Sequence, residues 1–253
     1  MPVVRSQGLS IHYEVVGRGP PILMHHGVMG RGAMWKAAGY LDELKDEFSF
    51  ILMDARGHGQ SDKPHDPAAY EGRRLAEDVL AVLDDIAAEQ AIYWGYSLGG
   101  RIGYELAGIA PERVSAFIIG GSTPYAIDLR VPVDGDSKDQ AQVRSAILDF
   151  FGVSAATLSR DHQDALFAND FLAVHAVLSE RPSIASVLAG MTMPCLIYVG
   201  GDDPRADASE RAASELPNAT FARLPGLDHG QAMLLTDHIL PHVEVFLRAN
   251  AAR

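Results

Sequence analysis

The 253-residue sequence predicts an α/β fold in which a mostly parallel sheet is covered by helices on both faces. Three observations carry this prediction. Short apolar runs alternate with segments whose apolar residues recur at helical spacing, as in parallel strands joined by helices. No internal repeat or low-complexity linker interrupts the alternation. The composition, with 47% hydrophobic and 21% charged residues, is that of an ordinary globular protein.

The expected elements follow one another along the chain. Residues 9–16 alternate apolar and polar side chains and end in a turn, so we expect an antiparallel strand at the edge of the sheet. The later strands are expected as short apolar runs typical of buried positions. They cover residues 21–25, 48–53, 91–94, 115–119, 196–199 and 219–224. Helices are expected at residues 33–44, 75–88, 99–109, 209–216 and 237–248.

Residues 125–191 depart from this alternation. After a polar stretch at residues 134–139, the segment is predicted to be helical throughout, without a strand. We therefore expect a core domain of residues 1–124 and 192–253, and a helical cap of residues 125–191 inserted between two strands. A cap at this position covers the end of the sheet where an active site is expected. An extra helical layer without a gating role is the alternative.

Charge and composition bear on partners and compartment. The formal net charge of −12 argues against nucleic acid and anionic membrane surfaces as partners. No apolar run approaches the length of a membrane span, and no secretory signal is recognisable. Cys195 is the only cysteine and permits no intramolecular disulfide. We expect a soluble cytoplasmic protein with a small-molecule substrate, without a nucleic-acid or membrane partner, and with homo-oligomer formation left open.

The most informative motif is Gly95-Tyr96-Ser97-Leu98-Gly99, a G-x-S-x-G sequence between an expected strand and an expected helix. A strand, a sharp turn and a helix place Ser97 at the apex of the turn. The serine is expected there in a strained backbone conformation, with its hydroxyl pointing out of the sheet. A Cβ atom at either flanking glycine would crowd so tight a turn.

A serine hydroxyl needs an adjacent base, and the base needs an orienting group. Asp203 follows the expected strand at residues 196–199, and His229 follows the one at residues 219–224. Both therefore fall at the carboxyl ends of strands, where open α/β sheets bind their ligands. The order serine, aspartate, histidine is that of one known lineage of catalytic triads.

Five motifs in register resemble those of the α/β-hydrolase superfamily over essentially the whole chain; they lie at residues 26–30, 54–61, 95–99, 200–204 and 225–230. The resemblance implies an eight-stranded sheet with a helical cap after the sixth strand. It also implies Ser97 as the nucleophile and His229 as general base and then acid. Asp203 would be the triad acid, with its neighbour Asp202 as the competitor.

The same resemblance places an oxyanion hole at two backbone N–H groups, those of Val28 and Leu98. We expect no metal site, because the ten histidines show no H-E-x-x-H or comparable spacing. We also expect no bound dinucleotide cofactor, because no G-x-G-x-x-G fingerprint follows a first strand.

The expected reaction is hydrolysis of a small to medium, largely apolar carboxylic ester or lactone through an acyl-enzyme. Six apolar cap side chains are candidates for lining the substrate pocket and, equally, for packing between the cap helices: Leu148, Phe150, Phe151, Phe167, Phe171 and Leu172. The resemblance leaves other activities open. They are a carbon–carbon bond hydrolase, a lyase like that of menaquinone synthesis, a cofactor-free perhydrolase and, outside the enzymes, a slow-turnover receptor for a small ligand.

Overall fold

The computed structural model describes residues 2–133, 138–154 and 159–250. Its main sheet has eight strands in the order β1-β2-β4-β3-β5-β6-β9-β10. Their bounds are β1 Val3–Ser6, β2 Leu9–Gly17, β3 Pro21–His25, β4 Ser49–Met53, β5 Ala91–Tyr96, β6 Val114–Gly120, β9 Cys195–Gly200 and β10 Ala219–Leu224. The pairs that involve β1 or β2 are antiparallel, and the others are parallel. The predicted eight-stranded, mostly parallel sheet is confirmed.

The edge of the sheet differs from the prediction. Strand β2 is antiparallel as expected, but it pairs with β4 on one side and with β1 on the other. The edge strand is therefore β1, and the prediction of an edge at residues 9–16 is wrong. Strand β1 is too short to show a periodic pattern. The turn that joins it to β2 has positive φ at Gln7 and Gly8, the geometry of a tight hairpin.

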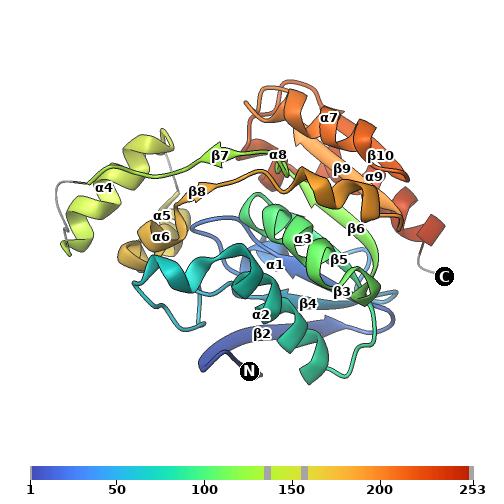
Figure 1. Cartoon of the computed structure of the whole chain (residues 1–253), viewed down its shortest axis with the longest axis horizontal. Helices are drawn as coiled ribbons and strands as arrows, with labels where there is room; N and C mark the ends of the chain where they lie inside the picture. The colour runs from blue at the N-terminus through green and yellow to red at the C-terminus, as the bar shows by residue number, and fades with distance from the viewer. Residues whose placement is uncertain (1, 134–137, 155–158, 251–253) are drawn as a thin grey trace.

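Helices cover both faces of the sheet, as predicted (Figure 1). Their bounds are α1 Ala33–Ala37, α2 Gly72–Asp85, α3 Leu98–Ile109, α7 Ala206–Glu215, α8 Gln231–Leu234 and α9 Thr236–Asn250, with short 3-10 turns at Pro67–Tyr70 and Pro111–Arg113. Leu23 of β3 packs in a cluster with α2 and α3, whereas its neighbour Ile22 packs in a second cluster with α9. This division follows because successive side chains of a strand point to opposite faces.

Only the first part of the helix predicted at residues 33–44 is helical. Helix α1 ends at Ala37, and Gly39 has a φ of +85°. A glycine in the left-handed region is a common end of a helix, so the rest of the segment forms turns. Its large apolar side chains are nonetheless buried: Trp35, Tyr40, Leu41 and Leu44. Their spacing reflected burial rather than a continuous helix.

The segment between β6 and β9 contains α4 Gln140–Phe150, α5 Arg160–Phe167, α6 Phe171–Val177 and the 3-10 helix Ala185–Gly190. It also contains two short strands, β7 Ile127–Asp128 and β8 Glu180–Arg181, which pair antiparallel where the segment leaves and rejoins the core (Figure 1). The prediction that this segment holds no strand is therefore wrong. Two-residue strands are too short to leave an alternating pattern. Of the predicted polar stretch, residues 134–137 lie outside the described residues.

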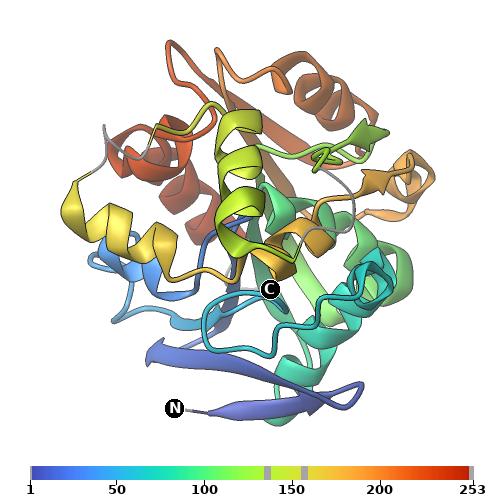
Figure 2. The same cartoon turned by 90° about the vertical axis from the view of Figure 1, so that its left-hand side faces the viewer.

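Helices α4 and α6 pack over the loop that follows β3. Val143 and Val174 belong to a small apolar cluster against which Val28 and Met29 of that loop pack. Asn169, between α5 and α6, donates a hydrogen bond to the Met29 carbonyl at 3.1 Å. When the inserted segment faces the viewer, α4 crosses in front of the core (Figure 2). The inserted segment thus lies against one of the loops that carry the candidate site.

Within the described ranges, no helix has both the length and the apolar character needed to cross a bilayer.

Candidate active site

Ser97 lies at the turn between β5 and α3, as predicted. Its φ of 54° and ψ of −108° are rare for a residue with a side chain. A Cβ atom at Gly95 would lie 2.4 Å from the Gly99 carbonyl oxygen, and one at Gly99 would lie 2.0 Å from that of His25. The strained apex and the steric need for both glycines are therefore confirmed.

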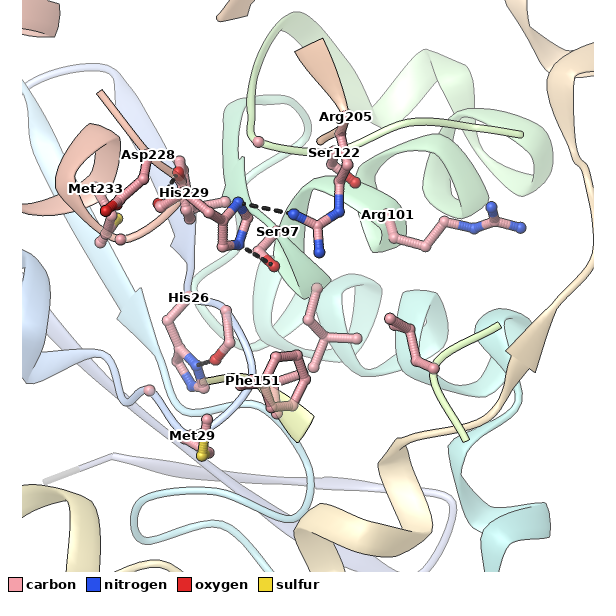
Figure 3. A pocket seen from close by; sticks show the side chains of 18 of the residues that line it. His26, Met29, Ser97, Arg101, Ser122, Phe151, Arg205, Asp228, His229 and Met233 are labelled. Atoms are coloured by element: carbon pink, nitrogen blue, oxygen red, sulfur yellow. Dashed lines mark hydrogen bonds between the residues drawn. The ribbon is translucent and has the colours of Figure 1, made fainter. Parts of the chain in front are cut away.

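Three predicted side chains meet at the carboxyl ends of their strands. His229 Nε2 lies 3.0 Å from Ser97 Oγ (Figure 3), and His229 Nδ1 lies 2.5 Å from Asp203 Oδ2. Asp203 is 3% exposed, whereas Asp202 is an exposed residue. Of the two adjacent aspartates, Asp203 is the one that contacts the imidazole.

The environment of Asp203 determines which nitrogen of His229 carries the proton. Burial alone raises the pKa of this carboxyl, but the hydrogen bond and charge of His229 and the backbone amide and charge of Arg205 outweigh it and lower the pKa. An ionised carboxylate only accepts hydrogen bonds, so His229 Nδ1–H donates to it. The lone pair of Nε2 is then directed at the Ser97 hydroxyl. This is the tautomer that a general base requires.

Arg205 is a member of this cluster that the sequence analysis missed. Its Nη1 donates to Asp203 Oδ1 at 3.0 Å and lies 3.0 Å from His229 Nδ1, the contact drawn as a dashed line in Figure 3. Because Nδ1 already carries a proton, this second contact brings two donors together. The only signal in the sequence was an arginine two residues after Asp203, which is equally typical of a charge facing solvent.

The loop after β3 is anchored by His26, which is fully buried. Its Nε2 accepts a hydrogen bond from the Ala55 amide at 3.0 Å, and its Nδ1 donates to the Gly27 carbonyl at 2.7 Å. Burial lowers the pKa of His26, opposed by the Gly27 hydrogen bond and the charge of Asp54. A neutral ring with a proton on Nδ1 satisfies both bonds. His26 lies in one of the five sequence motifs, but its role as an anchor was not predicted.

This anchor sets the direction of a neighbouring N–H group. The Gly27 carbonyl accepts from His26 and also from the Gly30 amide at 3.0 Å. In a trans peptide the C=O and N–H bonds point in opposite directions, so the Val28 N–H is directed away from these two donors. A Cβ atom on Gly27 would lie 3.1 Å from Ser97 Cβ, which shows how closely this backbone approaches the serine.

Leu98, directly after the serine, is the first residue of α3. The first N–H groups of a helix have no acceptor within the helix, so the Leu98 amide is available to a ligand. Val28 and Leu98 both line the cavity onto which Ser97 and His229 open. The site therefore offers two backbone donors beside the serine, from the two residues predicted.

The cavity has a volume of about 770 Å³ and mostly apolar walls. Phe150 and Phe151 line it, as predicted. The other four predicted cap side chains are not among its lining residues: Leu148, Phe167, Phe171 and Leu172. Three of these pack within the inserted segment, and Phe167 is an exposed side chain with the Arg144 guanidinium 5.0 Å from its ring centroid. The prediction did not separate the two faces of the cap helices.

Charged side chains occur among these apolar walls. They are Arg101, Arg181, Arg205, Asp202 and Asp228. Among the residues that the structure describes, no group of three or more histidine, cysteine, aspartate or glutamate side chains is arranged to hold a metal ion. Arg205 is the one of these charged side chains that contacts both Asp203 and His229.

Comparison with known proteins agrees with this architecture. A family model described as alpha/beta hydrolase fold matches residues 20–189. The chain is 32% identical to a 2-(acetamidomethylene)succinate hydrolase of Mesorhizobium japonicum, over 87% of this chain and 85% of the relative. It is 27% identical to a non-heme chloroperoxidase of Streptomyces lividans, over 98% and 99%. The solved enol-lactonase of Burkholderia xenovorans superposes with a TM-score of 0.83 at 22% identity, covering 98% of this chain and 100% of that structure, a likeness of fold. This chain is a member of the α/β-hydrolase-fold family.

Proposed function

We propose that this protein is a serine hydrolase that cleaves a small to medium carboxylic ester or lactone through an acyl-enzyme. The observation that carries the proposal is the chain of contacts from Ser97 Oγ through His229 to the buried carboxylate of Asp203. A serine activated in this way is a nucleophile for acyl transfer. The 32% identical succinate-derivative hydrolase supports a hydrolytic reaction on a small molecule.

In the first half of the proposed reaction, Ser97 Oγ attacks the carbonyl carbon while His229 Nε2 takes the hydroxyl proton. The carbonyl oxygen becomes an oxyanion, which the Val28 and Leu98 amides stabilise. Asp203 holds the imidazole in its orientation and stabilises the imidazolium. The tetrahedral intermediate then collapses, and His229 gives its proton to the leaving alkoxide.

In the second half, a water molecule attacks the acyl-enzyme. His229 removes a proton from that water, and the same two amides stabilise the second oxyanion. Collapse releases the carboxylic acid and returns the proton to Ser97. With a lactone, the alcohol and the acid leave as one molecule.

The cavity supports the proposed substrate size. Its volume of about 770 Å³ is within the range of small-molecule sites, and its mostly apolar walls suit a largely apolar substrate body. We further propose that residues 125–191 act as a cap domain on the core of residues 1–124 and 192–253. The contribution of Phe150 and Phe151 from this segment to the cavity wall supports that role.

Labelling with a fluorophosphonate, followed by peptide mapping, tests this function without knowledge of the substrate. The expected result is one adduct on Ser97 in the wild type and none in Ser97→Ala. A second assay is the release of p-nitrophenol from a short-chain ester, with an initial burst if deacylation is slow. Absence of an adduct from the folded wild-type protein would overturn the proposal. It would favour a receptor for a small ligand.

Perhydrolysis is a second candidate, favoured by the nearly full-length match to a non-heme chloroperoxidase. In this reaction hydrogen peroxide, in place of water, attacks the acyl-enzyme and yields a peracid and the free serine. The test adds peroxide to an ester assay and measures peracid through its oxidation of bromide. Formation of more peracid than carboxylic acid at millimolar peroxide would support this candidate. A carbon–carbon hydrolase or a lyase would instead leave simple esters uncleaved in both assays.

A further inference from the structure

We propose that the substrate carries a carboxylate near its scissile carbonyl and that Arg205 binds this carboxylate. The inference rests on the proposed function and adds to it the chemical class of the substrate: half-esters of short dicarboxylic acids, or lactones that bear a carboxylate. The remaining body of the substrate stays largely apolar, in keeping with the walls of the cavity.

The guanidinium of Arg205 is placed to bind a group of the substrate. Arg205 lines the cavity, and its side chain is 20% exposed. Among the hydrogen bonds of the described residues, its side chain donates only from Nη1, which leaves the donors on Nε and Nη2 for a ligand. Arg205 and Ser97 contact the two nitrogens of the same imidazole ring (Figure 3). A carboxylate a few bonds from the scissile carbonyl can therefore reach Arg205 while the carbonyl lies at Ser97.

The charges around His229 change during acylation. The buried carboxylate of Asp203 pairs with Arg205 before any reaction, so these two charges already cancel. When His229 takes the serine proton, the negative charge that forms at the same time lies on the substrate oxyanion at the Val28 and Leu98 amides, and beside the imidazolium one carboxylate faces two cations. Asp202 and Asp228 also line the cavity, but both are exposed, and Figure 3 shows Asp228 on the far side of His229 from Arg205. A substrate carboxylate on Arg205 places a second negative charge beside the imidazolium as it forms.

Two further arginines on the cavity wall, Arg101 and Arg181, share a single carboxylate. Arg181 is only 6% exposed, and its Nε has no hydrogen-bond partner. Arg101 is likewise buried, and its nearest carboxylate is Glu105, 3.6 Å from its Nε. One glutamate thus faces two buried arginines. At this part of the cavity wall one positive charge is left without a carboxylate, which favours a negatively charged group of the substrate.

The experiment compares two substrates matched in size, monoethyl succinate and the ethyl ester of succinamic acid, which replaces the carboxylate with a carboxamide. Hydrolysis is followed by proton release in a pH-stat. For the wild type we expect a kcat/KM higher for the charged ester by about tenfold or more, the scale of a charge-assisted hydrogen bond. In Arg205→Gln this ratio should fall to about one. Arg223→Gln is the matched control, because it removes an exposed positive charge that pairs with Asp207 and does not line the cavity, and it should keep the wild-type ratio.

The readout is the ratio of the two kcat/KM values, because Arg205 also contacts Asp203 and its replacement lowers activity on every ester. A wild type without preference for the charged ester would overturn the proposal, and so would an Arg205→Gln variant that loses equal activity on both esters. A second measurement needs no variant: succinate should inhibit the wild type competitively, and succinamide should not. Fluorophosphonate labelling of Ser97 is independent of substrate charge, so labelling without charge preference refutes this inference alone.

Discussion

Two histidines border the cavity near Ser97, and their surroundings give them different tasks. The His229 side chain is 32% exposed and bonded to a carboxylate on one nitrogen and to a hydroxyl on the other. His26 is fully buried and bonded to two backbone groups. The first arrangement suits proton transfer, because a carboxylate stabilises the imidazolium. The second suits a fixed neutral ring that anchors a loop. The partner atoms and the access of water, rather than the residue type, decide the role.

The largest losses of activity are expected for variants of His229 and of its partner Ser97. Ser97→Ala and His229→Ala should each lower kcat by roughly 10⁴- to 10⁶-fold, because nucleophile and base act as one unit. The double variant should be little worse than either single one. Steady-state kinetics on any cleaved ester checks this, with circular dichroism to confirm folding. Additive losses in the double variant would show that the two side chains do not act together.

Asp203→Asn should lower kcat by about 10³- to 10⁴-fold, somewhat less than loss of the base, since this carboxylate acts through the orientation of the ring. Asp202→Asn is the matched control at the adjacent position. We expect it to change kcat by less than about tenfold, because this exposed side chain does not contact the imidazole. If kcat fell further in the control than in Asp203→Asn, the assignment of the acid would have to be reversed.

For the buried histidine, His26→Ala should lower kcat about 10²-fold with a smaller change in KM. Without its anchor the Val28 amide is misdirected, which affects the oxyanion more than the bound substrate. His26→Asn is the informative second variant. Its side-chain N–H can take the place of Nδ1–H and donate to Gly27, so it should recover part of the lost rate. Equal losses in both variants, or a loss confined to KM, would contradict the role of His26 as an anchor.

The pH dependence of activity should reflect His229. A protonated imidazole cannot accept the proton of Ser97, so a histidine base makes kcat/KM fall on the acidic side of the pH profile. The profile is measured with a neutral ester over a pH range in which circular dichroism shows the protein folded. A flat rate between mildly acidic and mildly alkaline pH would exclude a histidine base.

The smallest effect is expected on stability and comes from the buried histidines. Burial lowers the pKa of His58 from 6.5 to about 3. Between these values the unfolded chain binds a proton that the folded protein does not bind, so the free energy of unfolding falls as pH is lowered. At pH 5 the loss amounts to about 2 kcal/mol from this residue. Urea unfolding at pH 7 and pH 5 measures it, and His58→Asn should reduce the difference; an unchanged difference would contradict this origin.

Much of the core could be predicted because the signals are local. Strands such as Pro21–His25 and Cys195–Gly200 are buried on both faces and appear in the sequence as continuous apolar runs. Other elements could not be predicted, because local patterns do not contain what forms them. Strands of two to four residues, β1, β7 and β8, exist because a partner strand lies beside them. The helix predicted at residues 33–44 stops early because Gly39 adopts a positive φ, whereas its side chains are buried as their pattern indicated.

The sequence alone determined the steric requirements and the order of the reactive groups. Gly95 and Gly99 flank Ser97 because no Cβ atom fits there, and Asp203 and His229 follow strands whose carboxyl ends meet at one edge. Only the tertiary structure decided which aspartate contacts the imidazole, that Arg205 lies against it, and which side chains of the inserted segment face the cavity. Backbone constraints depend on neighbours in the chain and can be recognised in the sequence. Contacts between side chains on different loops depend on how the whole sheet and the inserted segment pack, which no local pattern contains.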